Sequence, residues 1–256
     1  MDGTSVIIAV KGKSNLTNLL ESIDPNVCEV LIIGESLENY NLSGMNVKLI
    51  YTDENRSVAR NMGAEQAQHQ FLLFLDSDME LTGNLIKESI KEMSSLDALI
   101  FPEITLGNTL VAKGRRFERL GLYRSLYFEA PRMIRKDVFF EVGGYNPRLN
   151  AFEDLDLTRK IVNGNFKIGW SNCVIYHHEE NINLIGYIRK RITYTTKNKT
   201  IFTNFDKEYS RQLVKIKNRY NSFLNSIRIY KMRSACYLPF YFVVTLINLL
   251  TYMLIK

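Results

Sequence analysis

The sequence is dominated by short apolar runs, rich in Val, Ile and Leu, that alternate with segments of helical periodicity. The first runs are TSVIIAV at 4–10, EVLIIG at 29–34, VKLIYT at 47–52 and FLLFLD at 71–76. A run that is apolar along its whole length is typical of a strand buried on both faces, and helical connections between strands favour parallel pairing. The chain is therefore predicted to form an α/β, Rossmann-like fold with a mostly parallel sheet flanked by helices.

The same alternation continues further along the chain. We expect helices within 14–23, 56–68, 81–93, 137–146 and 152–164, and further strands within 97–104, 167–170 and 173–178. Glycines at 143, 144 and 164 are expected to end the last two helices. The stretch 113–135 scatters arginines among aromatic residues and is predicted to be a loop-rich or helical segment over the site.

The charge of the chain is unevenly distributed. At 256 residues and 46% hydrophobic composition the chain can bury a continuous core. Residues 1–128 carry 12 basic and 17 acidic side chains, whereas residues 129–256 carry 21 and 10. A basic excess favours an anionic partner, either lipid headgroups or nucleic acid. Because no recognisable nucleic-acid module accompanies it, we expect no nucleic-acid partner.

Cysteine usage and the N-terminus bear on the compartment. Cys28, Cys173 and Cys236 are widely spaced, which indicates neither a disulfide framework nor a zinc site. The beginning MDGTSVIIAV lacks the basic region, apolar core and cleavage site of a secretory signal. The catalytic part is therefore expected in a reducing compartment, at the cytoplasmic face of the cell membrane.

The C-terminal segment 237–255 reads YLPFYFVVTLINLLTYMLI and contains no charge. Its length approaches the ~20 residues that cross a bilayer. Pro239 and Asn248 weaken a simple spanning helix, so a helix lying in the interface and an apolar helix packed on protein remain alternatives. If the segment spans the membrane, Lys231 and Arg233 before it place the N-terminal part in the cytoplasm.

Two carboxylates emerge where the run FLLFL ends, at Asp76 and Asp78. The carboxyl edge of a parallel sheet is where open α/β folds bind ligands. Acids separated by one residue can hold a divalent cation through hard oxygen ligands, and such a metal would stabilise a diphosphate as a leaving group. The alternative is a solvated acidic turn in which Asp78 caps the next helix.

Two later groups also suit catalysis. Glu153 and Asp154 lie near a predicted helix start, where a carboxylate could act as general base toward an acceptor hydroxyl. Acids in a first turn can also simply stabilise the helix dipole. His177 and His178 end the last predicted strand, where an imidazole could complete a metal site or be only structural.

Together these segments resemble the family-two glycosyltransferases with a GT-A fold. The segments are VIIAV, RSVARNMGA leading into FLLFLDSDMEL, MIRKDVFFEVGGYNPRLNAFEDLDLTRKI, and YHHEE, and they cover about residues 4–180. The resemblance implies a UDP- or GDP-sugar donor, a divalent metal such as Mn²⁺ or Mg²⁺, and inversion at the anomeric carbon by direct displacement.

The resemblance also implies roles for individual residues. Asp154 would be the general base, with Glu153 beside it orienting donor or acceptor. Asp78 would ligate the metal, and His177 or His178 would contact the metal or the diphosphate. The residues expected on the donor nucleotide are Val10, Lys11, Glu35, Arg60, Asn61 and Asp76.

Two positions depart from the usual family pattern. Glu35 stands near the place where the family offers an Asp that reads the base, so it is a candidate substitute. The first strand ends in Ala9-Val10-Lys11 and not in a Pro-containing turn. Both differences concern the identity of the donor. They also leave open a catalytically silent nucleotide-sugar-binding scaffold at the membrane.

Residues beyond 183 resemble, more loosely, relatives that act on lipid-linked acceptors, through the basic segment YIRKRITYTTKNK. Each basic group near an anionic leaflet would contribute about 1 kcal/mol, although a solvated helix face is the alternative. The predicted parts are therefore a nucleotide-sugar-binding catalytic domain at 1–183 and a basic, helical, membrane-associating extension at 184–256. The expected acceptor is a lipid-linked or membrane-proximal glycan, and oligomers are possible.

Overall fold

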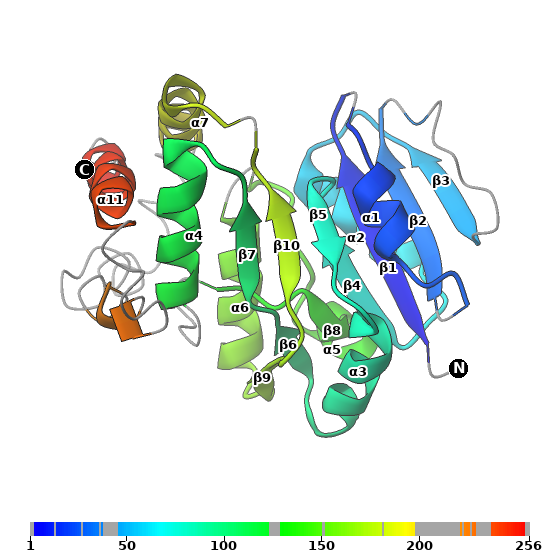
Figure 1. Cartoon of the computed structure of the whole chain (residues 1–256). Helices are drawn as coiled ribbons and strands as arrows, with labels where there is room; N and C mark the ends of the chain where they lie inside the picture. The colour runs from blue at the N-terminus through cyan, green and yellow to red at the C-terminus, as the bar shows by residue number, and fades with distance from the viewer. Residues whose placement is uncertain are drawn as a thin grey trace. The chain divides into compact units, whose positions relative to one another are not determined.

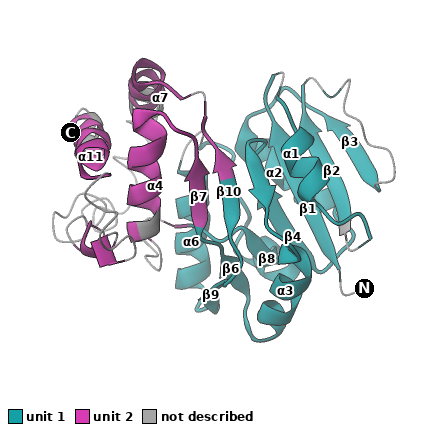
Figure 2. Cartoon of the chain, viewed as in Figure 1, with its two compact units in different colours: residues 1–102, 130–176 teal, residues 103–129, 177–256 magenta. Residues whose placement is uncertain are grey.

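The structure is a computed structural model of the chain (Figure 1). It describes residues 3–12, 14–26, 28–35, 37, 46–122, 129–149, 152–180, 182–197, 221, 223–225, 227–228 and 237–253. The chain divides into two compact units (Figure 2), and the predicted division at residue 183 stays a prediction. Unit 1 comprises Met1–Pro102 and Ala130–Tyr176, and unit 2 comprises Glu103–Glu129 and His177–Lys256.

The described part of unit 1 is built on a seven-stranded sheet with the order β3-β2-β1-β4-β8-β6-β9. Its strands are β1 (Thr4–Val10), β2 (Cys28–Gly34), β3 (Val47–Tyr51), β4 (Phe71–Leu75), β6 (Ala98–Ile100), β8 (Met133–Arg135) and β9 (Ile168–Trp170). Neighbouring strands pair in parallel except where β8 pairs with β4 and β6. The prediction of a mostly parallel sheet is confirmed.

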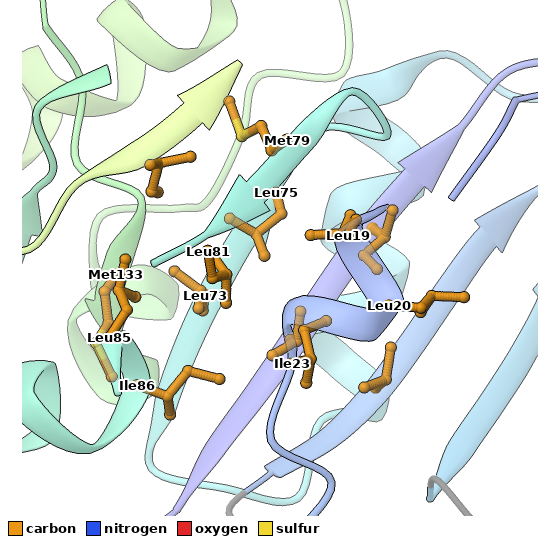
Figure 3. Close-up of a cluster of buried hydrophobic side chains, with 14 of the residues drawn as sticks. Leu19, Leu20, Ile23, Leu73, Leu75, Met79, Leu81, Leu85, Ile86 and Met133 are labelled. Atoms are coloured by element: carbon orange, nitrogen blue, oxygen red, sulfur yellow. The ribbon is translucent and has the colours of Figure 1, made fainter. Parts of the chain in front are cut away.

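Two helices, α1 (Thr17–Ser22) and α3 (Leu85–Glu92), cover one face of this sheet. Because side chains alternate along a strand, Val6 and Ile8 of β1 point to the same face. Both are fully buried in one apolar cluster with Leu19 of α1. Figure 3 shows how this cluster joins the helices to the strands.

The opposite face is covered by α2 (Arg56–Gln66), α5 (Lys136–Glu141) and α6 (Glu153–Asn163). Ile7 of β1 is fully buried in the cluster on this side. A Cβ added to Gly63 of α2 would lie 2.6 Å from Ile7, so a glycine there lets the helix approach the sheet closely. Helices on both faces explain why the strands are apolar throughout.

Unit 2 contains α4 (Leu110–Leu122), α7 (Leu184–Lys197) and α11 (Leu238–Met253). It also contains β7 (Glu103–Leu106) and the end of β10 (Ile175–His178), a strand that begins in unit 1. A small apolar core joins the three helices through one buried side chain of each. These side chains are Val111, Tyr187 and Val244.

The structure refines several predicted elements. The segment predicted as loop-rich or helical at 113–135 contains most of α4, which ends at Leu122, and β8; residues 123–128 lie outside the described residues. The helix predicted from residue 81 begins only at Leu85, because Met79–Leu81 forms strand β5.

The apolar C-terminal segment is represented by α11. Within the part of the chain that the structure describes, no helix has both the length and the apolar character needed to cross a membrane. Most of the basic stretch between α7 and α11, and residues 254 and 255, lie outside the described residues. The membrane-associating character of the extension therefore stays a prediction.

Candidate active site

Helix α2 begins at a well-formed cap. The side chain of Asn55 accepts hydrogen bonds from the backbone N–H groups of Ser57 at 2.9 Å and Val58 at 3.1 Å. Such a cap satisfies two of the N–H groups that a helix start leaves unpaired. The side chain of Ser57 also donates to the carbonyl of Leu149 at 2.7 Å, which ties the helix start to a distant segment of unit 1. The result is a fixed position for Arg60, one turn further on.

Arg60 is almost fully buried, with 1% of its surface exposed. Its guanidinium donates to Asp76 Oδ1 at 2.8 Å and to Glu153 Oε1 at 3.0 Å, and it lies over the ring of Tyr145 at 5.1 Å. Burial acts to lower the pKa of Arg60, but Tyr145, Asp76 and Glu153 outweigh burial and raise it. Arg60 is therefore a permanent cation that joins two carboxylates far apart in the sequence.

Asp76 follows β4 directly, as the sequence predicted, and both of its carboxylate oxygens are bound by arginines. Arg60 binds Oδ1, and Arg132 donates to Oδ2 at 3.1 Å. The half-exposed Arg56 lies further away, 3.8 Å from Oδ1. Asp78 lies two residues on, half-buried in the turn before β5. Sequence analysis missed Arg132, which belongs to no motif and reaches Asp76 only through the pairing of β8 with β4.

Glu153 and Asp154 occupy the first turn of α6, as predicted. Glu153 is 5% exposed, and burial together with the neighbouring charge of Asp154 raises its pKa, against the opposing effects of Arg60 and Arg56. Asp154 is half-buried, and its Oδ1 accepts from the backbone N–H of Leu155 at 2.9 Å. The two adjacent acids therefore have different environments, which is common where neighbouring carboxylates have different catalytic roles.

The residue before this pair has an unusual backbone. Phe152 has φ 63° and ψ 13°, in the left-handed region that favours glycine. A non-glycine residue in that region carries strain that the surrounding structure must hold in place. The strain lies directly before Glu153 and Asp154, so it fixes the direction in which α6 presents them.

The predicted nucleotide residues of β1 and β2 lie at the same edge of the sheet as Asp76. Val10 ends β1 and is paired in register with Gly34, which ends β2. A Cβ on Gly34 would lie 2.1 Å from the Val10 carbonyl, so only glycine allows this close approach. Lys11 and Glu35 follow these strand ends and are both exposed. Because β1 lies between β2 and β4, the structure brings all four predicted positions together.

Asn61, also predicted near the nucleotide, uses its side-chain amide on the backbone of Tyr145. Its Nδ2 donates to the Tyr145 carbonyl at 2.8 Å, and its Oδ1 accepts from the Tyr145 N–H at 3.0 Å. These two bonds hold the glycine turn after α5 against α2. The amide therefore supports the ring that lies on Arg60. A direct role of Asn61 toward a nucleotide stays a prediction.

His177 lies in unit 2, at the end of β10, and is 8% exposed. Its Nδ1 is 2.6 Å from Arg119 and 3.3 Å from Glu103 Oε2. If Nδ1 accepts from Arg119, Nε2 carries the proton; if Nδ1 donates to Glu103, Nε2 is the basic nitrogen that can bind a metal. Neither Arg119 nor Glu103 was singled out as a site residue from the sequence. The predicted role of His177 at a metal is not tested.

A second group of charges surrounds Glu179, two residues after His177 in the chain. Arg115 Nε lies 2.6 Å from Glu179 Oε2, and Arg119 lies 3.9 Å from Oε1. Burial acts to raise the pKa of Glu179, but Arg115 and Arg119 outweigh it and lower the pKa. Arg115 and Arg119 are four residues apart on α4 and therefore share a face, a spacing that was visible in the sequence.

The model of glycosyl transferase family 2 matches residues 5–156, which include every residue of the Arg60 network. The chain belongs to this family. Its fold is the GT-A fold that the sequence resemblance implied. No curated protein matches its sequence.

Solved structures are similar to the chain in fold. TarS of S. aureus is 16% identical with a TM-score of 0.54, and the match covers 99% of this chain and 54% of that one, so this chain spans about half of TarS. A TarS 1–349 structure in complex with UDP-GlcNAc is 15% identical with a TM-score of 0.52, covering 99% and 90%. The mannosyltransferase PcManGT from Pyrobaculum calidifontis, in complex with GDP-Man and Mn²⁺, is 12% identical with a TM-score of 0.60, covering 98% and 86%.

Proposed function

We propose that the protein is an inverting glycosyltransferase that moves a hexose-type sugar from a UDP- or GDP-sugar onto a lipid-linked or membrane-proximal glycan. The observation that carries the proposal is the position of Arg60. One buried cation binds both Asp76, on the donor side, and Glu153, beside the candidate base Asp154. A single arginine thereby fixes the two halves of a displacement reaction relative to each other.

The donor would bind at the edge of the sheet where β1, β2 and β4 end. Val10 and Lys11 would lie along the nucleotide, Glu35 would face the base, and Asp76 would face the ribose or base. Solved relatives of the same fold support such a donor, since their structures hold UDP, UDP-GlcNAc or GDP-Man. The choice between UDP and GDP rests on Glu35, which stands near the usual position of an Asp.

Inversion by direct displacement needs a base beside the acceptor and a leaving group on the opposite face of the sugar. In the proposed step Asp154 takes the proton of the acceptor hydroxyl while that oxygen bonds to the anomeric carbon. The bond between the anomeric carbon and the diphosphate oxygen breaks, and the nucleoside diphosphate leaves with its electron pair. Glu153, held by Arg60, orients the reacting groups and does not take the proton.

The family implies a divalent metal, and the carboxylate of Asp78, which follows β4, would be its protein ligand. Both oxygens of Asp76 are bound by arginines, which supports Asp78 as the proposed metal ligand. Mg²⁺ and Mn²⁺ are commonly held by one or two carboxylates together with substrate phosphates, so a single aspartate beside a diphosphate is a reasonable site. When bound, the metal neutralises charge that develops on the leaving diphosphate. The role of His177, which lies in unit 2, stays a prediction of the sequence resemblance.

The acceptor and the location are proposed from the second half of the chain. Residues 184–234 contain 13 Lys or Arg and only two acids, Asp206 and Glu208. Such a bias suits an anionic membrane surface or a polyprenyl phosphate. The proposed location is the cytoplasmic face of the cell membrane, where nucleotide-sugars and lipid-linked acceptors meet.

The test is turnover of the Asp154→Asn variant. Purified protein would be given UDP- and GDP-sugars with vesicles that contain polyprenyl-phosphate-linked sugars, and both nucleotide release and glycolipid product would be measured. We expect wild-type transfer with one donor and a loss of about 10²–10⁴-fold in rate for the variant, with donor binding retained.

Asp137→Asn is the matched control. Asp137 lies in the same unit, at the start of α5, with 65% of its side chain exposed, so the same change of charge there should leave the rate unaltered. An Asp154→Asn variant as active as wild type would contradict the assignment of the base. Donor binding without turnover across the whole acceptor panel would favour the catalytically silent scaffold.

A further inference from the structure

Helix α11 has two apolar faces with different surroundings. Tyr241, Val244 and Asn248 recur at helical spacing and are at most 4% exposed. Phe242 and Leu246, four residues apart, are 59% and 57% exposed, and Leu250 continues the series at 54%. Residues four apart lie on one side of a helix, so these three form an exposed apolar stripe.

The buried face fixes α11 to α4. A Cβ added to Gly114 of α4 would lie 2.5 Å from the Phe240 carbonyl, so the two helix backbones approach closely at this glycine. Val244 of α11 is completely buried in the core that it shares with Val111. Close backbone contact and a buried core prevent α11 from rotating freely on α4. The direction of the exposed stripe is therefore set by the fold of unit 2.

A buried polar chain strengthens this attachment. The Tyr187 hydroxyl donates to Asn248 Oδ1 at 2.8 Å, and Asn248 Nδ2 donates to the carboxylate of Glu118 at 3.1 Å. The chain links α7, α11 and α4 through one side chain of each. It explains why an asparagine interrupts an otherwise apolar segment, since a buried carboxylate needs a hydrogen-bond partner. Asn248 thus marks the protein side of α11, and the stripe marks the outer side.

Helix α7, which packs with α11 and α4 (Figure 2), adds exposed groups of two kinds. Ile185 and Ile192 are 64% and 39% exposed, and Arg189 and Lys190 are exposed beside them. Exposed apolar side chains together with basic ones are characteristic of protein surfaces that enter the headgroup layer of an anionic membrane. This charge complementarity favours a lipid surface over a second copy of the same basic chain as the partner of the stripe.

We propose that α11 lies flat in the surface of an anionic bilayer, with Phe242, Leu246 and Leu250 in the acyl boundary and the opposite face on α4. A helix held in this way enters the membrane by about 5–10 Å and does not cross it. The inference rests on the proposed function for the purpose of such attachment, which is access to a lipid-linked acceptor. Lipid binding itself is measured without donor or acceptor, so the two proposals can fail separately.

The first experiment measures cosedimentation of the full chain with vesicles of phosphatidylcholine, with and without about one third phosphatidylglycerol. Wild type is expected to bind the anionic vesicles. The variant F242S/L246S/L250S is expected to lose at least about tenfold in partition coefficient, because three apolar side chains no longer leave water. Equal binding of this variant and wild type would overturn the proposal. So would a wild-type dimer in light scattering that binds no vesicles and is dissociated by the variant.

The matched control replaces three exposed apolar side chains of unit 1 in the same way. They are Tyr51, Phe140 and Val162, with 59%, 45% and 43% of their surface exposed. This control is expected to bind vesicles like wild type, and nucleotide binding of the stripe variant verifies that unit 1 remains folded. A comparable loss in the control would contradict a specific role of α11.

A second experiment separates a flat helix from a spanning one. Trp170 is the single tryptophan of the chain, so Trp170→Phe allows a tryptophan to be placed in turn at positions 242, 246 and 250. Quenching by brominated lipids then gives the depth of each position. A flat helix places the three at equal depth, whereas a spanning helix separates 242 from 250 by about 12 Å. Depths that increase steadily along the helix would overturn the proposal.

Discussion

Both units bury a glutamate beside arginines, but the pKa values of the two glutamates shift in opposite directions. In unit 1, Arg60 is shared between Glu153 and Asp76, and Asp154 adds a further charge next to Glu153; the pKa of Glu153 is raised. In unit 2, Glu179 lies near two arginines, and its pKa is lowered. Burial acts to raise the pKa of both glutamates, and only around Glu179 do the neighbouring cations outweigh it. Unit 1 keeps carboxylates together at a cost in stability, which is common at functional sites, whereas the pairs around Glu179 stabilise their own fold.

The strongest test of this comparison removes each arginine. Arg60→Met leaves Glu153 and Asp76 without their shared cation, and we expect a loss of about 3–5 kcal/mol in the free energy of unfolding. The corresponding arginine in unit 2 is Arg115, which is paired with Glu179. Because Arg119 remains 3.9 Å from Glu179, Arg115→Met should cost less. Urea denaturation followed by circular dichroism measures both.

Nucleotide binding by the same two variants distinguishes the functions of the two arginine networks. Arg60→Met should also weaken UDP or GDP binding, since Asp76 loses its orientation, whereas Arg115→Met should leave binding unchanged. Equal losses of stability and of nucleotide binding in the two variants would mean that the networks do not differ in function.

A smaller effect is expected in the dependence of stability on pH. The pKa of Glu153 is raised above its ordinary 4.5, so its ionised form destabilises the fold. The fold therefore favours the protonated form of Glu153. The stability that this preference contributes is complete below about pH 4.5 and is lost as the pH rises through the folded-state pKa. The pKa of Glu179 is lowered from 4.5, so its contribution is present above that pH and is lost as the pH falls through the folded-state value.

Two variants measure this contrast, Glu153→Gln and Glu179→Gln, each compared with wild type by urea denaturation between about pH 7 and pH 4. As the pH falls, the free energy of unfolding of the wild type should increase relative to that of Glu153→Gln. Relative to Glu179→Gln, the free energy of unfolding of the wild type should instead decrease as the pH falls. The same direction of change in both pairs would contradict the comparison.

How much of the fold could be predicted depended on the length of each element. β1 was predicted with its observed bounds, 4–10, because it is buried on both faces and apolar from Val6 to Val10. β5 and β8 have only three residues each and no apolar run around them, whereas β6, equally short, lies in the apolar run DALIFPEI. β5 also displaced the expected start of α3, because the backbone N–H of Leu81 is bound by Ser22 of α1, a contact between distant segments.

The sequence predicted where the candidate site residues lie along the strands and helices, but not which of them contact one another. Asp76 and Glu153 stand where the strand and helix patterns placed them. Their connection through Arg60 could not be predicted, since Arg60 and Glu153 are 93 residues apart and one sequence carries no record of such pairing. Arg132 was missed for the same reason. Because buried charges need a partner, two acids at this position predict a nearby cation, but the sequence does not say which arginine supplies it.

The central claim, that the edge of the unit 1 sheet binds a nucleotide-sugar with a metal at Asp78, is tested most directly by calorimetry. UDP and GDP would be titrated into wild type and Asp78→Ala, each with Mn²⁺, with Mg²⁺ and with a chelator. We predict that one of the two nucleotides binds wild type in the presence of metal, and that binding is lost with the chelator or in the variant. Failure of both nucleotides to bind wild type under any of these conditions would contradict the account.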